Sequence, residues 1–121
     1  MRLLSLKYHI IENIKLIASD AAIQLSYYPD FTCKGDEIVN GLGDWLSLYK
    51  QKNNLEVDDS FLPEEITQII SLDEDISLLP SEKLCDAAII NSEEWTNIRK
   101  KAKEILNLLK VEYSLPDKRS I

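Results

Sequence analysis

Apolar side chains recur at steps of three and four residues near both ends of the 121-residue chain. The first series consists of Leu3, Leu6, Ile10, Ile14, Ile17, Ala21, Leu25 and Tyr28. The second consists of Trp95, Ile98, Ala102, Ile105, Leu106, Leu109 and Tyr113. An α-helix turns once in about 3.6 residues, so each series forms one apolar stripe along a helix. With only three Gly and four Pro, the chain is also too poor in turn residues for a β-sandwich. The pattern predicts an all-α fold, with one helix over residues 3–28 and another over residues 92–113.

A third apolar series lies in residues 30–50 and contains two glycines. Its members are Ile38, Leu42, Trp45, Leu46 and Tyr49. Gly41 and Gly43 bracket Leu42, and glycine inside a helix costs about 1 kcal/mol relative to alanine. The glycines therefore indicate either a break in the helix or the close approach of another backbone. We favour a kink or a second helix start near Asp44.

Proline positions set the expected boundaries in the middle of the chain. Residues 51–61 are polar at their start and predict a surface loop, after which Pro63 suits the first turn of a helix. A short strand over residues 66–70 is the alternative, but no other segment has the alternating pattern needed to pair with it. The acidic run at residues 73–75 can interrupt this helix, and Pro80 ends it. A short helix can follow over residues 81–90.

The last helix has the clearest start signal. Asn91 or Ser92 can cap it, and Glu94 stands three residues after Asn91 as in a capping box. We expect its basic side chains to point away from the core; they are Arg99, Lys100, Lys101 and Lys103. Pro116 follows its end, and residues 114–121 are expected to be a frayed tail. The chain therefore predicts a single domain over residues 1–121, built as an all-α bundle of four to six helices.

Acidic side chains are concentrated in residues 56–94. This segment holds twelve acids and one base, a net charge of −11 in a chain whose total is −7. Glu64, Glu65, Glu93 and Glu94 have a local explanation, because carboxylates are favoured in the first turn of a helix. The other eight lie in loops and short connections, where binding residues tend to sit. The predicted partner-binding residues are Asp58, Asp59, Asp73, Glu74, Asp75 and Glu82; the alternative is a merely solvated face.

The residues that catalytic and metal centres need are scarce. His9 is the only histidine, and we interpret it as a surface or half-buried packing residue, so a Ser/His/Asp or Cys/His centre is not expected. Zinc needs about four Cys and His ligands, and the chain has three such residues, far apart. The run from Asp73 lacks the glycine and glutamate of a calcium loop, since Leu78 and Leu84 stand at those positions. Paired carboxylates remain the one open route to hydrolysis. We expect no enzyme activity, no metal and no cofactor.

Charge and cysteine content bear on location and partners. The sequence pI of about 4.7 argues against nucleic-acid binding. No apolar run approaches the roughly 20 residues of a membrane span, and the first residues do not resemble a signal peptide. Cys33 and Cys85 can form a disulfide in an oxidising compartment, but we favour two buried, reduced thiols and a cytoplasmic location. The aromatic residues at positions 27–49 are interpreted as a core seam, with a ligand pocket as the alternative.

Two stretches resemble small helical bacterial immunity proteins. These are the run Gln24 to Phe31, followed by Asp36-Glu37 and Asp44-Trp45, and the run Ser92 to Leu106. Such proteins accompany polymorphic toxins, including those of contact-dependent growth inhibition systems. The resemblance implies a cytoplasmic protein that binds a cognate toxin domain and blocks its active site or another essential surface. It carries over no binding residue, because immunity families differ in the surface that they use.

The charge pattern agrees with this resemblance. Toxins that act on nucleic acid present basic clefts, and an acidic partner is steered to such a cleft by complementary charge. We therefore expect a non-enzymatic inhibitor of a toxin domain. The alternative is a regulatory or adaptor module, including an acidic mimic of nucleic acid that binds basic proteins. The sequence leaves the oligomeric state and the chemistry of the toxin undetermined.

Overall fold

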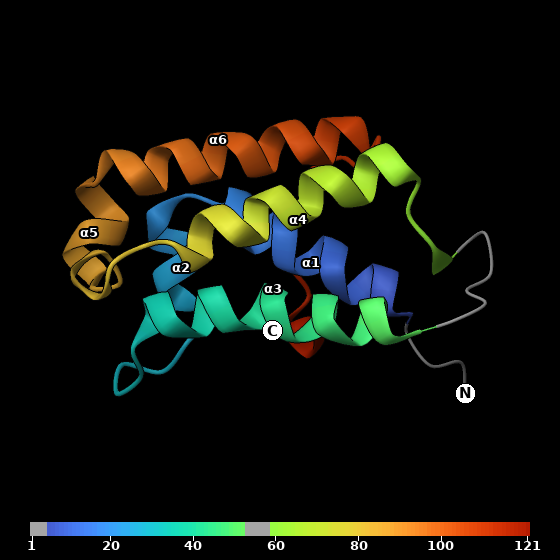
Figure 1. Ribbon diagram of the computed structural model, residues 1–121. Coiled ribbons are helices and arrows are strands. Elements are labelled where there is room, and N and C mark those ends of the chain that lie inside the picture. The colour runs from blue at the N-terminus through green and yellow to red at the C-terminus, as the bar shows by residue number, and fades with distance from the viewer. Residues whose placement is uncertain (1–4, 53–58) are drawn as a thin grey trace.

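The computed structural model describes residues 5–52 and 59–121, and it confirms the all-α fold (Figure 1). Every regular element in these two stretches is a helix. In chain order they are α1 (Leu6–Ala18), α2 (Ala21–Ser26), α3 (Lys34–Gln51), α4 (Pro63–Ser77), the 3₁₀ turn η2 (Ser81–Lys83), α5 (Asp86–Asn91), α6 (Glu93–Leu108) and the 3₁₀ turn η3 (Lys118–Ser120). The six α-helices fall within the expected four to six.

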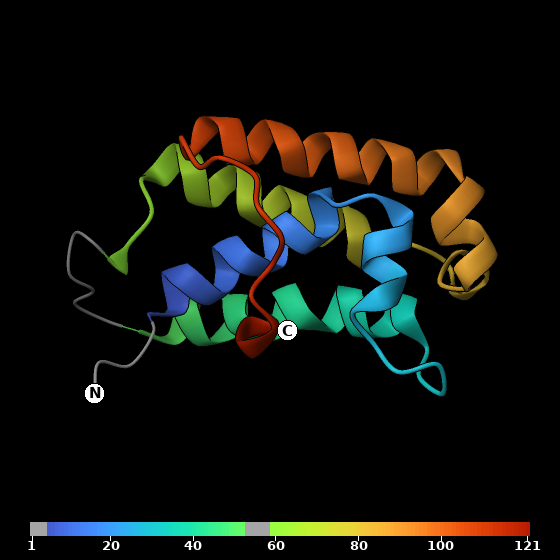
Figure 2. The same cartoon turned by 180° about the vertical axis from the view of Figure 1, so that it is seen from behind.

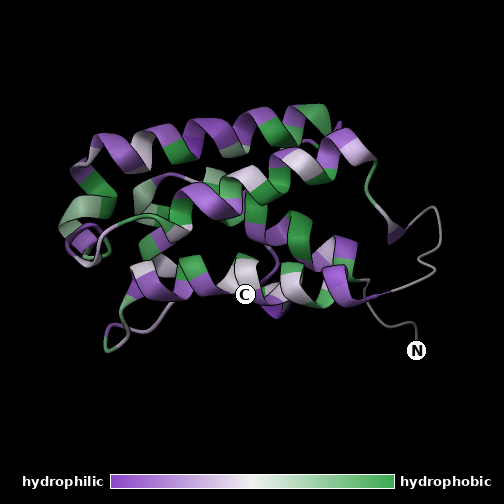
Figure 3. Ribbon diagram, in the orientation of Figure 1, coloured by the Kyte–Doolittle hydropathy of each residue, from purple (hydrophilic) through white to green (hydrophobic). Residues whose placement is uncertain are grey.

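Helix α1 lies at the centre of the bundle (Figures 1 and 2). It packs against α3 on one side and α6 on the other, while α4 contacts both α3 and α6. The largest fully buried side chains come from all the long helices and from α5; they are Trp95, Ile10, Ile14, Leu16, Ile17, Ile38, Leu42, Leu46, Ile69, Leu72, Ile76 and Ile89. Burying one such side chain contributes about 1.5–3 kcal/mol. Figure 3 shows hydrophobic and hydrophilic residues alternating along each helix, as expected when one face is buried.

The first predicted helix is divided in two at Ser19, so the expectation of one helix over residues 3–28 is wrong. Ser19 and Asp20 are extended, with ψ of 156° and 155°. The buried side-chain amide of Gln24 turns back and donates to the carbonyl oxygens of Leu16 and Ile17, at 3.2 and 2.9 Å. These bonds occupy carbonyls at the end of α1, where the helix no longer supplies its own donors.

The glycines of α3 do not break the helix, which is continuous over Lys34–Gln51, so the expected second helix start near Asp44 is wrong. A Cβ added to Gly41 would lie 2.7 Å from Oδ1 of Asn13, which shows that glycine permits a close contact with α1. The close approach of another backbone occurs instead at Gly35. There an added Cβ would lie 2.7 Å from Cα of Leu84 and would clash with its carbonyl oxygen.

Helices α4 and α6 begin close to where the sequence predicted. Pro63 occupies the first turn of α4, and Glu65 accepts a hydrogen bond from the backbone N–H of Leu62 at 2.7 Å. Helix α4 continues through the acidic run at residues 73–75, and the alternative of a strand over residues 66–70 is wrong. The hydroxyl of Ser92 caps α6 by accepting from the N–H of Trp95 at 3.2 Å.

The C-terminal tail folds back across α1, so the expectation of a frayed segment over residues 114–121 is wrong (Figure 2). Ser120 is buried, and its carbonyl oxygen accepts hydrogen bonds from the side chains of Asn13 and Trp45, at 2.8 and 3.0 Å. The tail is held mainly by polar groups of α1 and α3, which an apolar periodicity does not reveal.

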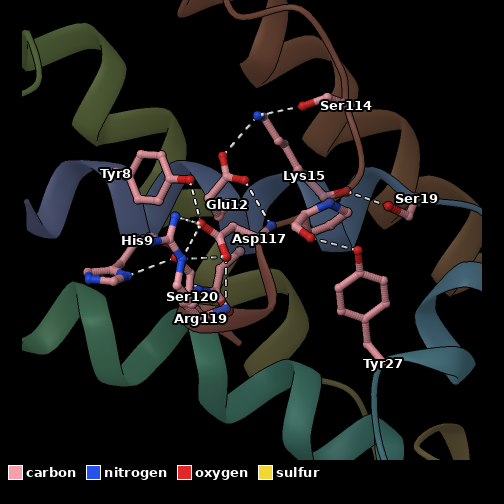
Figure 4. Close-up of polar contacts among 12 residues, drawn as sticks. Tyr8, His9, Glu12, Lys15, Ser19, Tyr27, Ser114, Asp117, Arg119 and Ser120 are labelled. Carbon is pink, nitrogen blue, oxygen red and sulfur yellow. Dashed lines mark hydrogen bonds and ion pairs between the residues drawn. The ribbon is translucent and has the colours of Figure 1, made fainter. Parts of the chain in front are cut away.

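Charged groups complete this attachment (Figure 4). The carboxylate of Asp117 accepts from the hydroxyl of Tyr8 at 2.7 Å and from the guanidinium of Arg119 at 2.6 Å. The backbone N–H of Asp117 donates to the buried carboxylate of Glu12 at 2.9 Å, and Lys15 pairs with Glu12 at the same distance. We name this network the tail clasp; it consists of Tyr8, His9, Glu12, Asn13, Lys15, Trp45, Asp117, Arg119 and Ser120.

Candidate functional site

The structure separates the acidic residues that lie together in the sequence. Of the six predicted partner-binding residues, Asp58 lies outside the described part of the chain. Asp59 is half-buried just before the start of α4, whereas residues 73–75 lie near its end. A helix rises about 1.5 Å per residue, so about 20 Å separates these two places. The turn η2, which contains Glu82, follows α4 and lies at the other end of the molecule from the start of that helix (Figure 1).

The three acids near the end of α4 point in different directions. Asp73 is half-buried toward α3, with Oδ1 3.5 Å from the place where a Cβ on Gly43 would lie. Burial raises the pKa of Asp73, although Lys50 opposes the shift. Asp75 pairs with Lys101 of α6 at 2.6 Å. Glu74, which is exposed, has no ion-pair partner among the described residues. Within this run Glu74 is therefore the acid best placed to meet another molecule.

Acids from distant parts of the sequence meet at the end of the molecule formed by the α2–α3 loop, η2 and α5 (Figure 1). We name this region, residues 27–37 and 77–94, the acidic end. It holds two bases, Lys34 and Lys83. Its seven acids are Asp30, Asp36, Glu37, Glu82, Asp86, Glu93 and Glu94. Only Glu82 is among the predicted partner-binding residues. The first three were not considered because they belong to a part of the chain in which acids and bases balance, and Glu93 and Glu94 were attributed to the first turn of a helix.

Both bases of the acidic end are already neutralised. Lys34 is buried, and its Nζ lies 3.5 Å from a carboxylate oxygen of Asp30 and 3.6 Å from one of Asp86. Lys83 pairs with Glu94 at 3.1 Å. Among the described residues, the remaining acids of this region have no ion-pair partner; they are Asp36, Glu37, Glu82 and Glu93. The surface that this end presents to solvent is therefore negative.

Large apolar side chains are exposed in the same region. Phe31 is 90% exposed and Leu78 is 81% exposed, while Ile90 on α5 is about half exposed. The expectation of a core seam is wrong for Phe31, although the other members pack partly buried against the core; they are Tyr27, Tyr28, Trp45 and Tyr49. Contiguous exposed apolar patches often mark sites of interaction with other molecules, and these three side chains come from three segments of the acidic end.

Comparison with protein-family models, with curated proteins and with solved structures finds no match. Within residues 5–52 and 59–121, no helix is long and apolar enough to cross a membrane. In the same stretches, no group of three or more His, Cys, Asp or Glu side chains is arranged to hold a metal ion.

The two cysteines also lie in the acidic end. The expectation that they are buried is wrong, because Cys33 and Cys85 are both exposed, with free thiols. Each immediately precedes a helix, Cys33 before α3 and Cys85 before α5. The exposure of the two cysteines could not be predicted from their residue type, since cysteine is usually buried.

Two other regions are weaker candidates. In the tail clasp the charged groups are paired with one another, which suits an attachment of the tail more than a reactive centre. An open groove of about 600 Å³ lies between α4 and α6, lined by two acids and two bases; its lining includes Glu64, Glu104, Lys100 and Lys101. The charges of this groove balance, and its lining includes neither Phe31 nor any acid of the acidic end.

Proposed function

We propose that this protein is a non-enzymatic inhibitor that binds a basic protein domain, a cognate toxin domain, through its acidic end. The observation that carries the proposal is the position of Phe31. Its ring is 90% exposed on a short loop beside Asp30, in a region where both bases are already paired. Such an arrangement offers an exposed apolar contact at an end of the molecule that also carries unpaired acids.

The charge supports fast capture of a basic partner. Acids without a partner lower the potential around the whole end of the molecule, and complementary charge raises association rates well above those of neutral surfaces. The effect reaches about 8 Å at physiological ionic strength. An inhibitor of a lethal protein benefits from such rapid association.

The apolar residues support tight retention. Charge at the rim of an interface mainly affects association, whereas a few buried anchors, often aromatic, hold a complex together. Phe31 and Leu78 suit this role because both are large and almost fully exposed in the free protein. Their burial in a complex would add apolar contact without disturbing the core.

The choice of a toxin as the partner comes from the resemblance of the sequence to immunity proteins. Toxins that act on nucleic acid carry basic clefts for their substrates, and the acidic end suits such a cleft in charge. Cytoplasmic action follows from the same resemblance and is part of the proposal.

The test is co-expression of this protein with the C-terminal domain of a large secreted protein encoded beside it. We expect the domain alone to stop growth, and co-expression to restore growth and yield a stable complex. Failure to protect, or the absence of such a neighbouring coding sequence, would count against the proposal. Similar affinity for many unrelated basic proteins would favour an acidic mimic of nucleic acid instead.

A further inference from the structure

The two cysteines lie close together although more than fifty residues separate them in the sequence. Cys33 precedes the first residue of α3, and Cys85 precedes the first residue of α5. The two helix starts lie at the same end of the molecule in both views (Figures 1 and 2). The sulfur of Cys33 lies 3.9 Å from the carbonyl oxygen of Leu84, the residue just before Cys85.

Gly35 fixes this proximity at the level of the backbone. Its Cα approaches the backbone of Leu84 so closely that an added Cβ would lie 2.7 Å from Cα of Leu84. A carbonyl oxygen and the next Cα lie about 3 Å apart across a trans peptide. The sulfur of Cys33 is therefore at most about 7 Å from Cα of Cys85.

Neither thiol is committed to a strong interaction. Neither cysteine side chain caps the helix that follows it. Cys85 donates to the carbonyl oxygen of Glu82 at 3.4 Å, and within the described stretches Cys33 makes one long contact, with the carbonyl oxygen of Leu84. Thiols are weak donors, so rotation about the Cα–Cβ bonds sacrifices little.

We propose that Cys33 and Cys85 are a site of disulfide formation, oxidised by exchange with a small-molecule disulfide. The thiolate of one cysteine attacks a sulfur of the small molecule, which forms a mixed disulfide and releases one small thiol. The thiolate of the other cysteine then attacks the protein sulfur of that mixed disulfide, which closes the protein disulfide and releases the second small thiol. Two protein thiols are oxidised, and one small-molecule disulfide is reduced to two thiols.

The bond would tie the loop that carries Phe31 to the start of α5. It would also close a loop of more than fifty residues, which restricts the unfolded chain and raises stability. For a domain of this size the thermal midpoint should rise by roughly 10 °C. Formation of this bond does not depend on the proposed function, because it involves only the two cysteines and a small-molecule disulfide.

The experiment treats the purified protein with bis(2-hydroxyethyl) disulfide, which is neutral and so is not repelled by the acidic end. We expect an intact mass lower by two hydrogen atoms, a Cys33–Cys85 cross-linked peptide after digestion, and a raised thermal midpoint that dithiothreitol reverses. The single variants Cys33→Ser and Cys85→Ser should instead each retain one hydroxyethylthio adduct.

A matched control moves one thiol to another exposed place. The double variant Cys33→Ser, Leu115→Cys keeps two exposed cysteines, since Leu115 is 64% exposed, but separates them. It should gain two adducts and form no internal bond. Two adducts on the wild-type protein, a bond between two molecules, or no reaction would overturn the proposal.

Discussion

The indole of Trp45 stacks on the imidazole of His9, with ring centroids 4.0 Å apart and ring planes inclined by 9°. Nδ1 of His9 lies 2.8 Å from the hydroxyl of Ser120, whose carbonyl oxygen accepts from the indole of Trp45. Helix α1, helix α3 and the tail therefore meet at a single point. The stability of the tail should depend on these few contacts.

Replacing Trp45 with phenylalanine tests the contribution of the indole hydrogen bond. Trp45→Phe keeps an aromatic ring beside His9 but leaves the carbonyl of Ser120 without that donor, so we expect a loss of about 1 kcal/mol. Urea unfolding followed by circular dichroism measures the change. Leu115→Ala, on an exposed part of the same tail, should change stability by less than about 0.5 kcal/mol. Equal effects of the two variants would show that the tail is not held at Trp45.

His9 should titrate below its ordinary pKa. Burial lowers the pKa of His9, Asp117 partly opposes the shift, and Arg119 adds to it. The unfolded chain then takes up the proton more readily than the folded protein. The stability from neutral His9 is present above about pH 6.5 and is lost as the pH falls through that value toward the lower folded pKa.

The measurement is the imidazole chemical shift, which is unambiguous because the chain has one histidine. We expect a midpoint below 6.5 in the folded protein and a return toward 6.5 in concentrated urea. A folded midpoint at or above 6.5 would contradict burial by the tail.

Replacing each of two glycines with alanine should change the stability of the protein in opposite directions. Gly43→Ala places its Cβ in ordinary contact with Asp73, 3.5 Å from Oδ1, so the gain in helix propensity should stabilise the protein by about 0.5–1 kcal/mol. Gly35→Ala drives its Cβ into the backbone of Leu84 and should destabilise by more than about 1 kcal/mol. Thermal and urea unfolding of the two variants measure the sign of each change in the free energy of unfolding. Equal behaviour of the two variants would refute the close contact at Gly35.

Much of the fold is predictable because burial on a helix leaves a periodic trace. The stripes from Ile10 to Ile17 and from Trp95 to Leu106 are buried in α1 and α6 as the spacing predicts. The break at Ser19 also had a local signal, since Ser and Asp favour the residue before a helix. The close contact at Gly41 had no such local signal. It depends on Asn13 of α1, and the sequence does not show that these two residues lie side by side.

The charge distribution could also be predicted in part from the sequence. The acidic surplus of residues 56–94 is visible in the sequence, but the contribution of Asp30 and Asp36 depends on how α3 meets α5. Phe31 was assigned to the core because phenylalanine is usually buried, and residue type alone does not reveal the exceptions. Arg99 was expected to face solvent, yet it donates to the side chain of buried Gln24 at 2.9 Å and joins α6 to α2.

The proposed interface predicts that Phe31 controls the lifetime of the complex. Phe31→Ala should leave the free energy of unfolding nearly unchanged, because the ring is 90% exposed in the free protein. It should speed dissociation from the toxin domain about tenfold or more if the ring is an anchor. Leu115→Ala removes a comparable exposed side chain elsewhere and should not alter dissociation. Surface plasmon resonance gives both rates, and a wild-type dissociation rate for Phe31→Ala would remove Phe31 from the interface.

Binding of the proposed toxin domain through the acidic end is tested by its association rate, measured by stopped flow for Glu82→Lys and Glu112→Lys. Both residues are exposed and both changes alter the total charge equally, but Glu82 lies in the acidic end and Glu112 lies on the tail. The acidic-end account predicts that Glu82→Lys slows association several-fold at low salt, that Glu112→Lys has a much smaller effect, and that the difference shrinks as salt is added. Equal rates for the two variants at low salt would contradict it.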